Sequence, residues 1–314
     1  MLEFEGIYGT ARVWINGALA TVNRNGYMGF SVDLKPWICY GQENLIKIDV
    51  DNSNQPNSRW YTGSGIYRDV NLWTGKGVYI PHDEMKITTL SVNDDVAVVE
   101  VCANVKNTKE CGIEAKCYVE LIFEGKTVVT EKQNIVFYSG RKETVRVQIP
   151  VKCPKKWSTD HPNLYQCCVK TYIGDEICDE YTVDFGIRTL TLDPVNGFQI
   201  NGETVNLRGT CIHHDNGVIG AETFPEAEWY RCKRLKEAGF NAIRSSHHPM
   251  SRAMLDACDH LGMLVMDELT DMWNRGKNTY DFSDIFKEEA PKWIHHMVDK
   301  DYNHPSVVIY SVGN

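Results

Sequence analysis

Residues 241–268 have the sequence NAIRSSHHPMSRAMLDACDHLGMLVMDE, and this stretch decides the fold class of the C-terminal part of the chain. We predict a strand at 241–244, a helix at 252–261 and a second strand at 263–266. Gly262 ends the helix, since glycine is common just after a helix C-terminus. A helix that connects two successive strands indicates that these strands are parallel.

The same alternation of strand and helix extends on both sides of this stretch. We predict a strand at 205–212 and a helix at 226–238 before it, and a helix at 288–301 and a strand at 306–312 after it. Polar residues gather after the strands, which is typical of the active-site face of a (β/α)8 barrel. Residues 187–314 are therefore predicted to form the first half of a TIM barrel, with four of its strands.

The part of the chain before residue 187 predicts β-structure. Short runs rich in Val, Ile, Tyr and Thr alternate with Gly, Asn and Asp turns, and no long helical period appears. Residues 83–186 contain runs with the length expected of an immunoglobulin-like β-sandwich, at 96–105, 113–123, 144–149 and 166–172. Residues 1–82 are predicted as a separate β-domain, with strands at 11–15, 45–50 and 78–80. The fold class is therefore multidomain, with β-domains followed by an α/β domain.

The composition excludes several classes of function. The chain has 33 Lys and Arg against 42 Asp and Glu, a formal net charge of −9, which argues against binding to nucleic acid or to an anionic membrane surface. No apolar run approaches the roughly 20 residues that span a bilayer. The N-terminus lacks the pattern of a signal peptide, and none of the 11 cysteines forms a C-x-x-C pair. A cytoplasmic protein with reduced thiols is therefore expected.

Three pairs of neighbouring histidines stand out, at 213–214, 247–248 and 295–296. Imidazole is a common metal ligand, and a metal-dependent barrel hydrolase is one interpretation of these pairs. However, neighbouring residues in a strand point to opposite faces, so each strand-end pair offers only one ligand to the site. We therefore favour polar contacts with a substrate for His213 and His247. We expect the third pair on a helix surface, and we predict no metal site and no cofactor.

Two longer motifs resemble the signatures of a known enzyme family. The residues NAIRSSHHP at 241–249, with the helix and strand that follow, are similar to the first signature of glycoside hydrolase family 2, the family of β-galactosidases, β-glucuronidases and β-mannosidases. The residues DYNHPSVVIYSVGN at 301–314 resemble its second signature. His248, Tyr302 and Tyr310 depart from the usual residues, which are tyrosine, a basic residue and tryptophan. Further motifs similar to the family stand at 13–17, 58–61, 65–70, 185–188 and 207–209, so the resemblance covers the whole chain.

The resemblance implies a retaining glycosidase with two catalytic glutamates and a jelly-roll sugar-binding domain, of which residues 1–82 are a part. The acid/base glutamate of the family immediately follows the asparagine of the second signature, here Asn314, and the nucleophile belongs to a later strand. A retaining site needs two carboxyl groups about 5 Å apart. The chain as given is therefore expected to lack the catalytic pair and to be inactive by itself.

The resemblance also implies how residues of this chain contact the substrate. Arg244 would hold the carboxylate of the nucleophile and favour its ionised form. Asn314 would hydrogen-bond the 2-hydroxyl of the sugar, a contact that strengthens in the transition state. His213 and His247 would hold other hydroxyl groups.

The end of the third predicted strand carries further polar residues. We expect a supporting role for the neighbouring carboxylates at 267–268, which are followed by Asp271 and Trp273 as candidate substrate contacts. Trp273 either stacks on a sugar face or packs within its loop. Arg59 is a further candidate substrate contact. Arg59 and Arg68 are candidates for orienting a loop of the N-terminal domain toward the barrel, and for Arg68 a structural ion pair is the favoured interpretation.

The predicted function is that of part of a retaining β-glycosidase acting on terminal β-linked sugars, with β-galactosides favoured. β-Glucuronides and β-mannosides are alternatives within the family, and a non-catalytic carbohydrate-binding protein is an alternative of another class. Met272 and Asn274 stand where magnesium-binding galactosidases have Glu and His, so the resemblance brings no metal site. A carbohydrate substrate is the expected partner, and the whole protein is expected to be a homo-oligomer.

Overall fold

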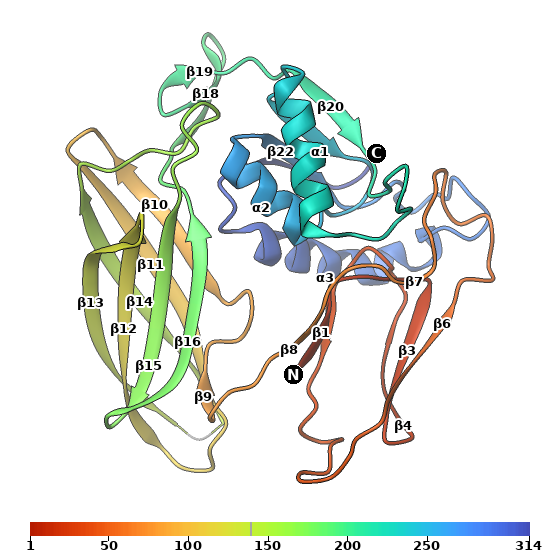
Figure 1. Ribbon diagram of the computed structural model, residues 1–314, viewed down its shortest axis with the longest axis horizontal. Coiled ribbons are helices and arrows are strands. Elements are labelled where there is room, and N and C mark those ends of the chain that lie inside the picture. Colours follow the sequence, from red (N-terminus) through yellow and green to blue (C-terminus); the bar gives the residue numbers. More distant parts are fainter. Residues whose placement is uncertain (139) are drawn as a thin grey trace.

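The computed structural model of the protein describes residues 1–138 and 140–314. Figure 1 shows three parts: short strands near the N-terminus, a β-sandwich, and a layer of parallel strands with helices packed on it. The predicted fold class, a multidomain protein with β-domains and an α/β domain, is confirmed.

The N-terminal part consists of short antiparallel strands. One sheet has the order β5-β1-β8, a second has the order β4-β3-β6, and β2 pairs with β7. The bounds are β1 Leu2–Phe4, β2 Ile7–Tyr8, β3 Thr10–Ile15, β4 Ala18–Asn23, β5 Phe30–Val32, β6 Ile46–Asp51, β7 Gly65–Ile66 and β8 Val70–Leu72. In β3, the side chains of Ala11, Val13 and Ile15 are fully buried, as the period of two in a strand requires. The strands predicted at 11–15 and 45–50 are β3 and β6.

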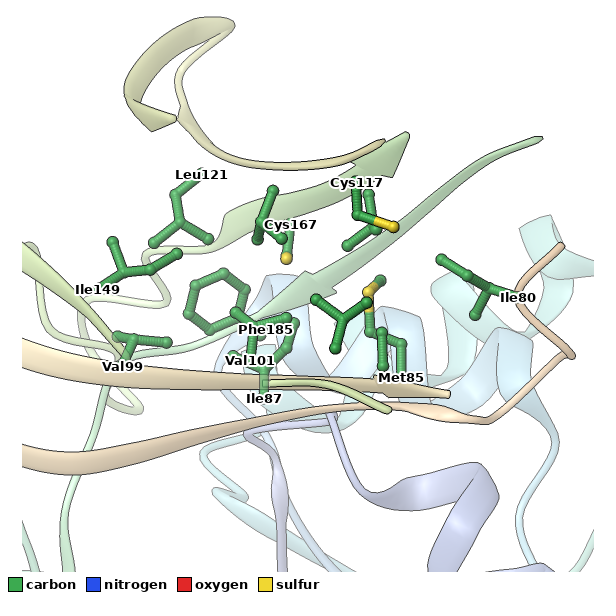
Figure 2. Close-up of a cluster of buried hydrophobic side chains, with 14 of the residues drawn as sticks. Ile80, Met85, Ile87, Val99, Val101, Cys117, Leu121, Ile149, Cys167 and Phe185 are labelled. Carbon is green, nitrogen blue, oxygen red and sulfur yellow. The ribbon is translucent and has the colours of Figure 1, made fainter. Parts of the chain in front are cut away.

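Two antiparallel sheets form the sandwich. The first has the order β10-β11-β14, with β9 also paired to β11, and the second has the order β13-β12-β15-β16. The bounds are β9 Val78–Tyr79, β10 Met85–Val92, β11 Val96–Asn107, β12 Ile113–Phe123, β13 Lys126–Phe137, β14 Lys142–Lys152, β15 Tyr165–Ile173 and β16 Glu176–Phe185. Figure 2 shows Val99 and Val101 of one sheet facing Leu121 and Cys167 of the other across the core. Because apolar residues alternate along the predicted runs, each strand turns one apolar face to the other sheet, and the two sheets pack as a sandwich.

One predicted strand belongs to a different sheet from the one expected. The strand predicted at 78–80, near the end of the N-terminal domain, is β9, and it pairs with β11 of the sandwich. Val78 and Ile80 are buried in the sandwich core, which explains why this short strand docks there.

Four parallel strands form the α/β layer in chain order, with β20 at Gly209–Ile212, β21 at Ala242–Ser245, β22 at Leu264–Glu268 and β23 at Val307–Ser311. A hairpin of β17 Leu190–Asp193, β18 Gly197–Ile200 and β19 Glu203–Thr204 precedes them. The predicted strands are confirmed, but the one predicted at 205–212 is shorter. Its first half leaves the sheet, since the Arg208 N–H donates to the side chain of Asn241 at 2.7 Å rather than to a neighbouring strand.

Three helices connect the parallel strands: α1 Pro225–Glu237, α2 Arg252–Leu261 and α3 Ser283–Asp301. The Ser251 hydroxyl accepts a hydrogen bond from the Met254 N–H at the start of α2, and Gly262 ends α2 in the left-handed conformation, as predicted. The helix predicted at 288–301 begins earlier, because Phe286 near its start packs in one cluster with Trp293 and with residues of the N-terminal part. No helix among the described residues is long and apolar enough to cross a membrane.

Arg252 of α2 ties the three parts together. Its guanidinium lies 2.6 Å from Asp83 Oδ2, at the start of the sandwich, and 3.4 Å from Glu3 Oε1 of β1. Burial lowers the pKa of Arg252, but the charges of Asp83 and Glu3 outweigh this effect and raise it. The ion pairs therefore hold the arrangement of domains in which the N-terminal strands face the α/β layer.

Two predictions about polar side chains are wrong. Arg68 forms no ion pair within the described part of the chain. It is buried and donates to the carbonyl oxygens of Tyr27 at 3.2 Å and Pro249 at 3.0 Å, because it lies where two domains meet and backbone acceptors face it. In the pair 295–296, only His295 is exposed, since the side of α3 that carries His296 faces Gly29 of the N-terminal part.

Gly262→Ala tests how the sandwich packs against the α/β layer. Gly262 has a φ of +67°, and a Cβ atom there would lie 2.3 Å from the carbonyl oxygen of Thr159. We expect the substitution to lower the free energy of unfolding by about 2–4 kcal/mol, from left-handed strain and this clash together. Gly239→Ala is the control, because Gly239 also has a positive φ, +92°, but has open space around it. Equal losses for both variants in urea unfolding would contradict this packing.

Candidate active site

The polar residues of the parallel layer meet at one edge. Arg244 lies on β21, Glu268 ends β22, and Ser311 ends β23, directly beside Glu268 in the sheet register. Asn314 follows β23. Because parallel strands all end at the same edge, side chains far apart in the sequence come together here.

Glu268 is the centre of this edge. Its carboxylate is fully buried and accepts hydrogen bonds from Arg244 Nη2 at 2.8 Å and Ser311 Oγ at 2.8 Å, and it lies 2.5 Å from His247 Nδ1. The hydrogen bond to Glu268 raises the pKa of Arg244. Arg244 Nη2 also donates to Asn314 Oδ1 at 3.0 Å, so one carboxylate organises residues of three consecutive strands.

Asp271 is a second buried carboxylate, in the loop after β22. Arg59 of the N-terminal part binds it with two nitrogens: Nε lies 2.8 Å from Oδ2, and Nη2 pairs with Oδ1. Lys277 Nζ at 3.2 Å and Asn314 Nδ2 at 3.0 Å also donate to Oδ1. Burial raises the pKa of the Asp271 carboxyl, but the hydrogen bonds from Arg59, Asn314 and Lys277 outweigh it and hold the pKa below its usual value. Asp271 is therefore a structural anion that joins two domains.

Aromatic and imidazole rings form one wall of the site. The Trp60 ring stacks on His213 with centroids 4.7 Å apart, and it meets His247 edge-on at 5.6 Å. Burial lowers the pKa of His213. A neutral imidazole beside an indole offers one donor and one acceptor nitrogen, which suits contact with hydroxyl groups.

The second histidine of each strand-end pair packs against Tyr27, behind this wall. His248 stacks on Tyr27 with centroids 4.4 Å apart, and His214 meets the same ring edge-on at 5.3 Å. Burial lowers the pKa of His214 to about 4 and holds that of His248 well below its usual value. In the described residues, the groups compact enough to hold a metal lie elsewhere and include neither His213 nor His247.

Most of the predicted contact residues lie in one connected group. Shared hydrogen bonds, ion pairs or ring contacts link Arg59, His213, Arg244, His247, Asp271 and Asn314. Trp273 lies at the margin, half exposed, with its indole against the backbone of Gly313. Which of these residues contact a sugar stays a prediction.

Sequence reasoning left Trp60 and Lys277 out of this group. Glu268 was expected to support the site, and its contacts with Arg244, His247 and Ser311 agree with that role. Trp60 stands within the motif at 58–61 that carried the resemblance. Lys277 follows no recognisable pattern, and only the fold brings it to Asp271.

Comparisons with known proteins agree with this architecture. A sandwich followed by a parallel α/β layer with a polar edge defines a multidomain protein with a barrel-type α/β domain. Residues 78–188 match the family model described as Glycosyl hydrolases family 2, and residues 194–314 match the model described as Glycosyl hydrolases family 2, TIM barrel domain. The chain belongs to glycoside hydrolase family 2.

Similar proteins with names or solved structures include members from several Bacteroides species. The β-galactosidase BoGH2A of Bacteroides ovatus is 36% identical over 100% of this chain and 37% of its own length. A crystal structure of a family 2 member from Bacteroides cellulosilyticus has a TM-score of 0.97 and 38% identity, over 100% of this chain and 40% of its own. A β-glucuronidase from Bacteroides uniformis has a TM-score of 0.87 and 26% identity, over 98% and 38%. The chain thus spans less than half the length of these relatives.

Glu268→Gln tests the buried ion pairs at the sheet edge. The amide cannot balance the charge of Arg244, so we expect the free energy of unfolding to fall by about 2–4 kcal/mol. Glu237→Gln is the matched control, because the pair of Glu237 with Arg234 is exposed and should contribute about 0.5 kcal/mol or less. Urea unfolding of the three proteins measures the difference, and a loss for Glu268→Gln no larger than the control's would reject the central place of this carboxylate.

Proposed function

We propose that the whole protein containing this chain is a retaining β-glycosidase, and that the edge of the parallel layer holds its sugar. The observation that carries this proposal is the fixed amide of Asn314. Its Oδ1 accepts from Arg244 and its Nδ2 donates to Asp271, which leaves the second N–H of Nδ2 for a ligand. A rigid donor at this place suits the 2-hydroxyl contact that the family uses in the transition state.

The carboxylates of this edge organise the site rather than react. A retaining mechanism needs one carboxyl group to protonate the leaving group and another to form the glycosyl–enzyme bond. Glu268 is committed to Arg244 and His247, and Asp271 to Arg59 and Lys277. We propose that the reacting glutamates come from other residues of the whole protein. The family resemblance puts the acid/base directly after Asn314.

Arg244 has the donors to support a nucleophile of this kind. It uses Nε and Nη2 for Glu268 and Asn314, and its guanidinium, on a side chain that is 31% exposed, also interacts with the thiol of Cys211. A guanidinium held in this way favours the ionised form of an adjacent carboxylate, the form that attacks the sugar.

β-Galactosides are the substrates that we propose, supported by the name of the Bacteroides ovatus relative. β-Glucuronides are the second candidate. The cations Arg59 and Lys277 at the site have partly exposed side chains, and a relative of similar fold is named a β-glucuronidase. A panel of aryl β-galactoside, β-glucuronide and β-mannoside on the full-length protein tests this choice, and the largest kcat/KM identifies the sugar.

Arg244→Ala in the full-length protein tests the role of the guanidinium. We expect kcat on the best aryl glycoside to fall by about 10²–10⁴-fold, because the nucleophile and Asn314 both lose their support. Arg234→Ala, an exposed arginine of α1, serves as the control and should leave kcat unchanged. A kcat for Arg244→Ala within a few-fold of wild type would reject this role.

The 314-residue chain on its own is expected to show no glycosidase turnover, because its two site carboxylates are held by cations and cannot serve as acid and nucleophile. Release of aryl alcohol by the isolated chain is compared with a buffer blank and with the full-length protein. Turnover above the blank would show that residues of this chain perform the chemistry themselves.

A further inference from the structure

A second group of ionisable side chains lies beneath the sugar site. Asp267 precedes Glu268 on β22, so its side chain points to the opposite face of the sheet. Asp301 is the last residue of α3, which packs on that side. Both residues are buried, with 0% and 1% of their surface exposed.

The contacts of the two carboxyl groups leave one oxygen on each without an N–H or hydroxyl donor. Asp267 Oδ1 accepts from Ser245 Oγ at 2.7 Å and from the Met250 N–H at 2.9 Å. Asp301 Oδ1 accepts from Lys300 Nζ. In the described part of the chain, the Oδ2 atoms of both residues have no such donor, although the two side chains are within hydrogen-bonding contact of each other. Two ionised carboxylates can only accept hydrogen bonds, so a bond between them requires a proton.

The charges of the group lead to the same conclusion. Lys300 Nζ, on a side chain only 8% exposed, pairs with Asp301 and lies 3.9 Å from Asp267 Oδ2. Two ionised carboxylates with one ammonium group would leave a net negative charge in the interior, which is strongly unfavourable. One proton on the acid pair makes the group neutral.

Two more titratable groups face this pair, and neither supplies a cation to it directly. His304, after α3, has its Nδ1 2.6 Å from Asp259 Oδ2; burial lowers the pKa of His304, but the charge of Asp259 outweighs this effect and raises it, so the positive charge of His304 is matched by Asp259. Tyr310 of β23 is partly buried near both carboxyls, and burial raises the pKa of its hydroxyl. The proton that neutralises the group therefore resides on the two carboxyl groups.

We propose that Asp301 keeps its proton at neutral pH and donates it to Asp267, and that this acid pair is a positioning element of the sugar site. Asp267 orients the hydroxyl of Ser245, whose oxygen accepts the backbone N–H of Glu268 at 2.8 Å. These two hydrogen bonds fix the end of β22. They thereby fix the Glu268 carboxylate, which binds Arg244 and His247. Burial raises the pKa of Asp301 well above its usual value, in agreement with this assignment.

Ionisation of the pair should loosen the site at alkaline pH. The folded state keeps a proton that the unfolded chain releases near pH 4. The stabilisation is thus complete below the unfolded pKa and is lost as the pH rises through the folded pKa. Asp301→Asn replaces this proton by an amide N–H and keeps the hydrogen bond without the titration. Asp301→Ala removes the bond.

Infrared spectroscopy of the full-length protein tests the proton without reference to activity. We expect the difference spectrum of wild type minus Asp301→Asn at pH 7 to 8 to contain the C=O band of a protonated carboxyl group, shifted in D2O; the proton of the acid/base glutamate is present in both proteins and cancels. Asp299→Asn is the matched control, because Asp299 lies on the same helix in a half-exposed pair with Lys86 and should leave the band in place. Absence of the band from the difference spectrum would overturn the proposal.

Kinetics test the positioning role, and this part alone rests on the proposed function. We expect Asp301→Asn to keep kcat within about threefold of wild type at neutral pH and to lose the part of the alkaline fall in kcat that ionisation of the pair adds to that of the acid/base glutamate. Asp301→Ala should lower kcat by about 10-fold or more at all pH values. A loss in Asp301→Asn as large as in Asp301→Ala would indicate an ordinary ion pair with Lys300 and refute the proton on Asp301. If the wild type turns over no glycoside, the proposed function fails while the infrared result still decides the proton.

Discussion

Burying carboxylates at the edge of the parallel layer is the constraint on which the rest of the site depends. A buried charge is strongly unfavourable unless a cation or several donors surround it. Glu268 meets this requirement with Arg244, His247 and Ser311, which come from the ends of β21 and β23, the two neighbours of β22 in the sheet. The need to compensate one carboxylate thus sets the relative positions of the strand ends.

The same requirement extends across domain boundaries. Asp271 finds its main partner, Arg59, in the N-terminal part, and Arg252 of α2 finds its partners in β1 and at the start of the sandwich. The N-terminal part also contributes Trp60, which stacks on His213. The candidate sugar site is therefore a product of two domains, and its shape depends on the ion pairs that hold them together.

Neutral and charged groups are separated in this arrangement. The histidines His214 and His248 are buried among aromatic rings and stay neutral, whereas the cations lie around Glu268 and Asp271. Sugars are neutral and rich in hydroxyl groups. The aromatic wall can stack on a sugar ring, and the fixed donors can hydrogen-bond its hydroxyl groups. The carboxylates of the site are already paired with cations.

The sequence by itself determined the local elements. The apolar spacing of α2, its Ser251 cap and Gly262 predicted that helix correctly, and the alternation of strand and helix predicted the parallel layer, because these features depend on neighbouring residues. Only the tertiary structure decided the partners. Arg59 and Asp271 are 212 positions apart, and no local pattern links them.

The errors have the same origin. Arg68 was expected to pair with an acid, but the domain interface presents it with carbonyl groups, and α3 begins earlier than predicted because a distant cluster stabilises its first turn. Propensity and spacing act over a few residues, whereas ion pairs and packing depend on which surfaces the completed fold brings together. The sequence therefore determined the strands, helices and family motifs, and the docking of the domains decided which side chains share the site.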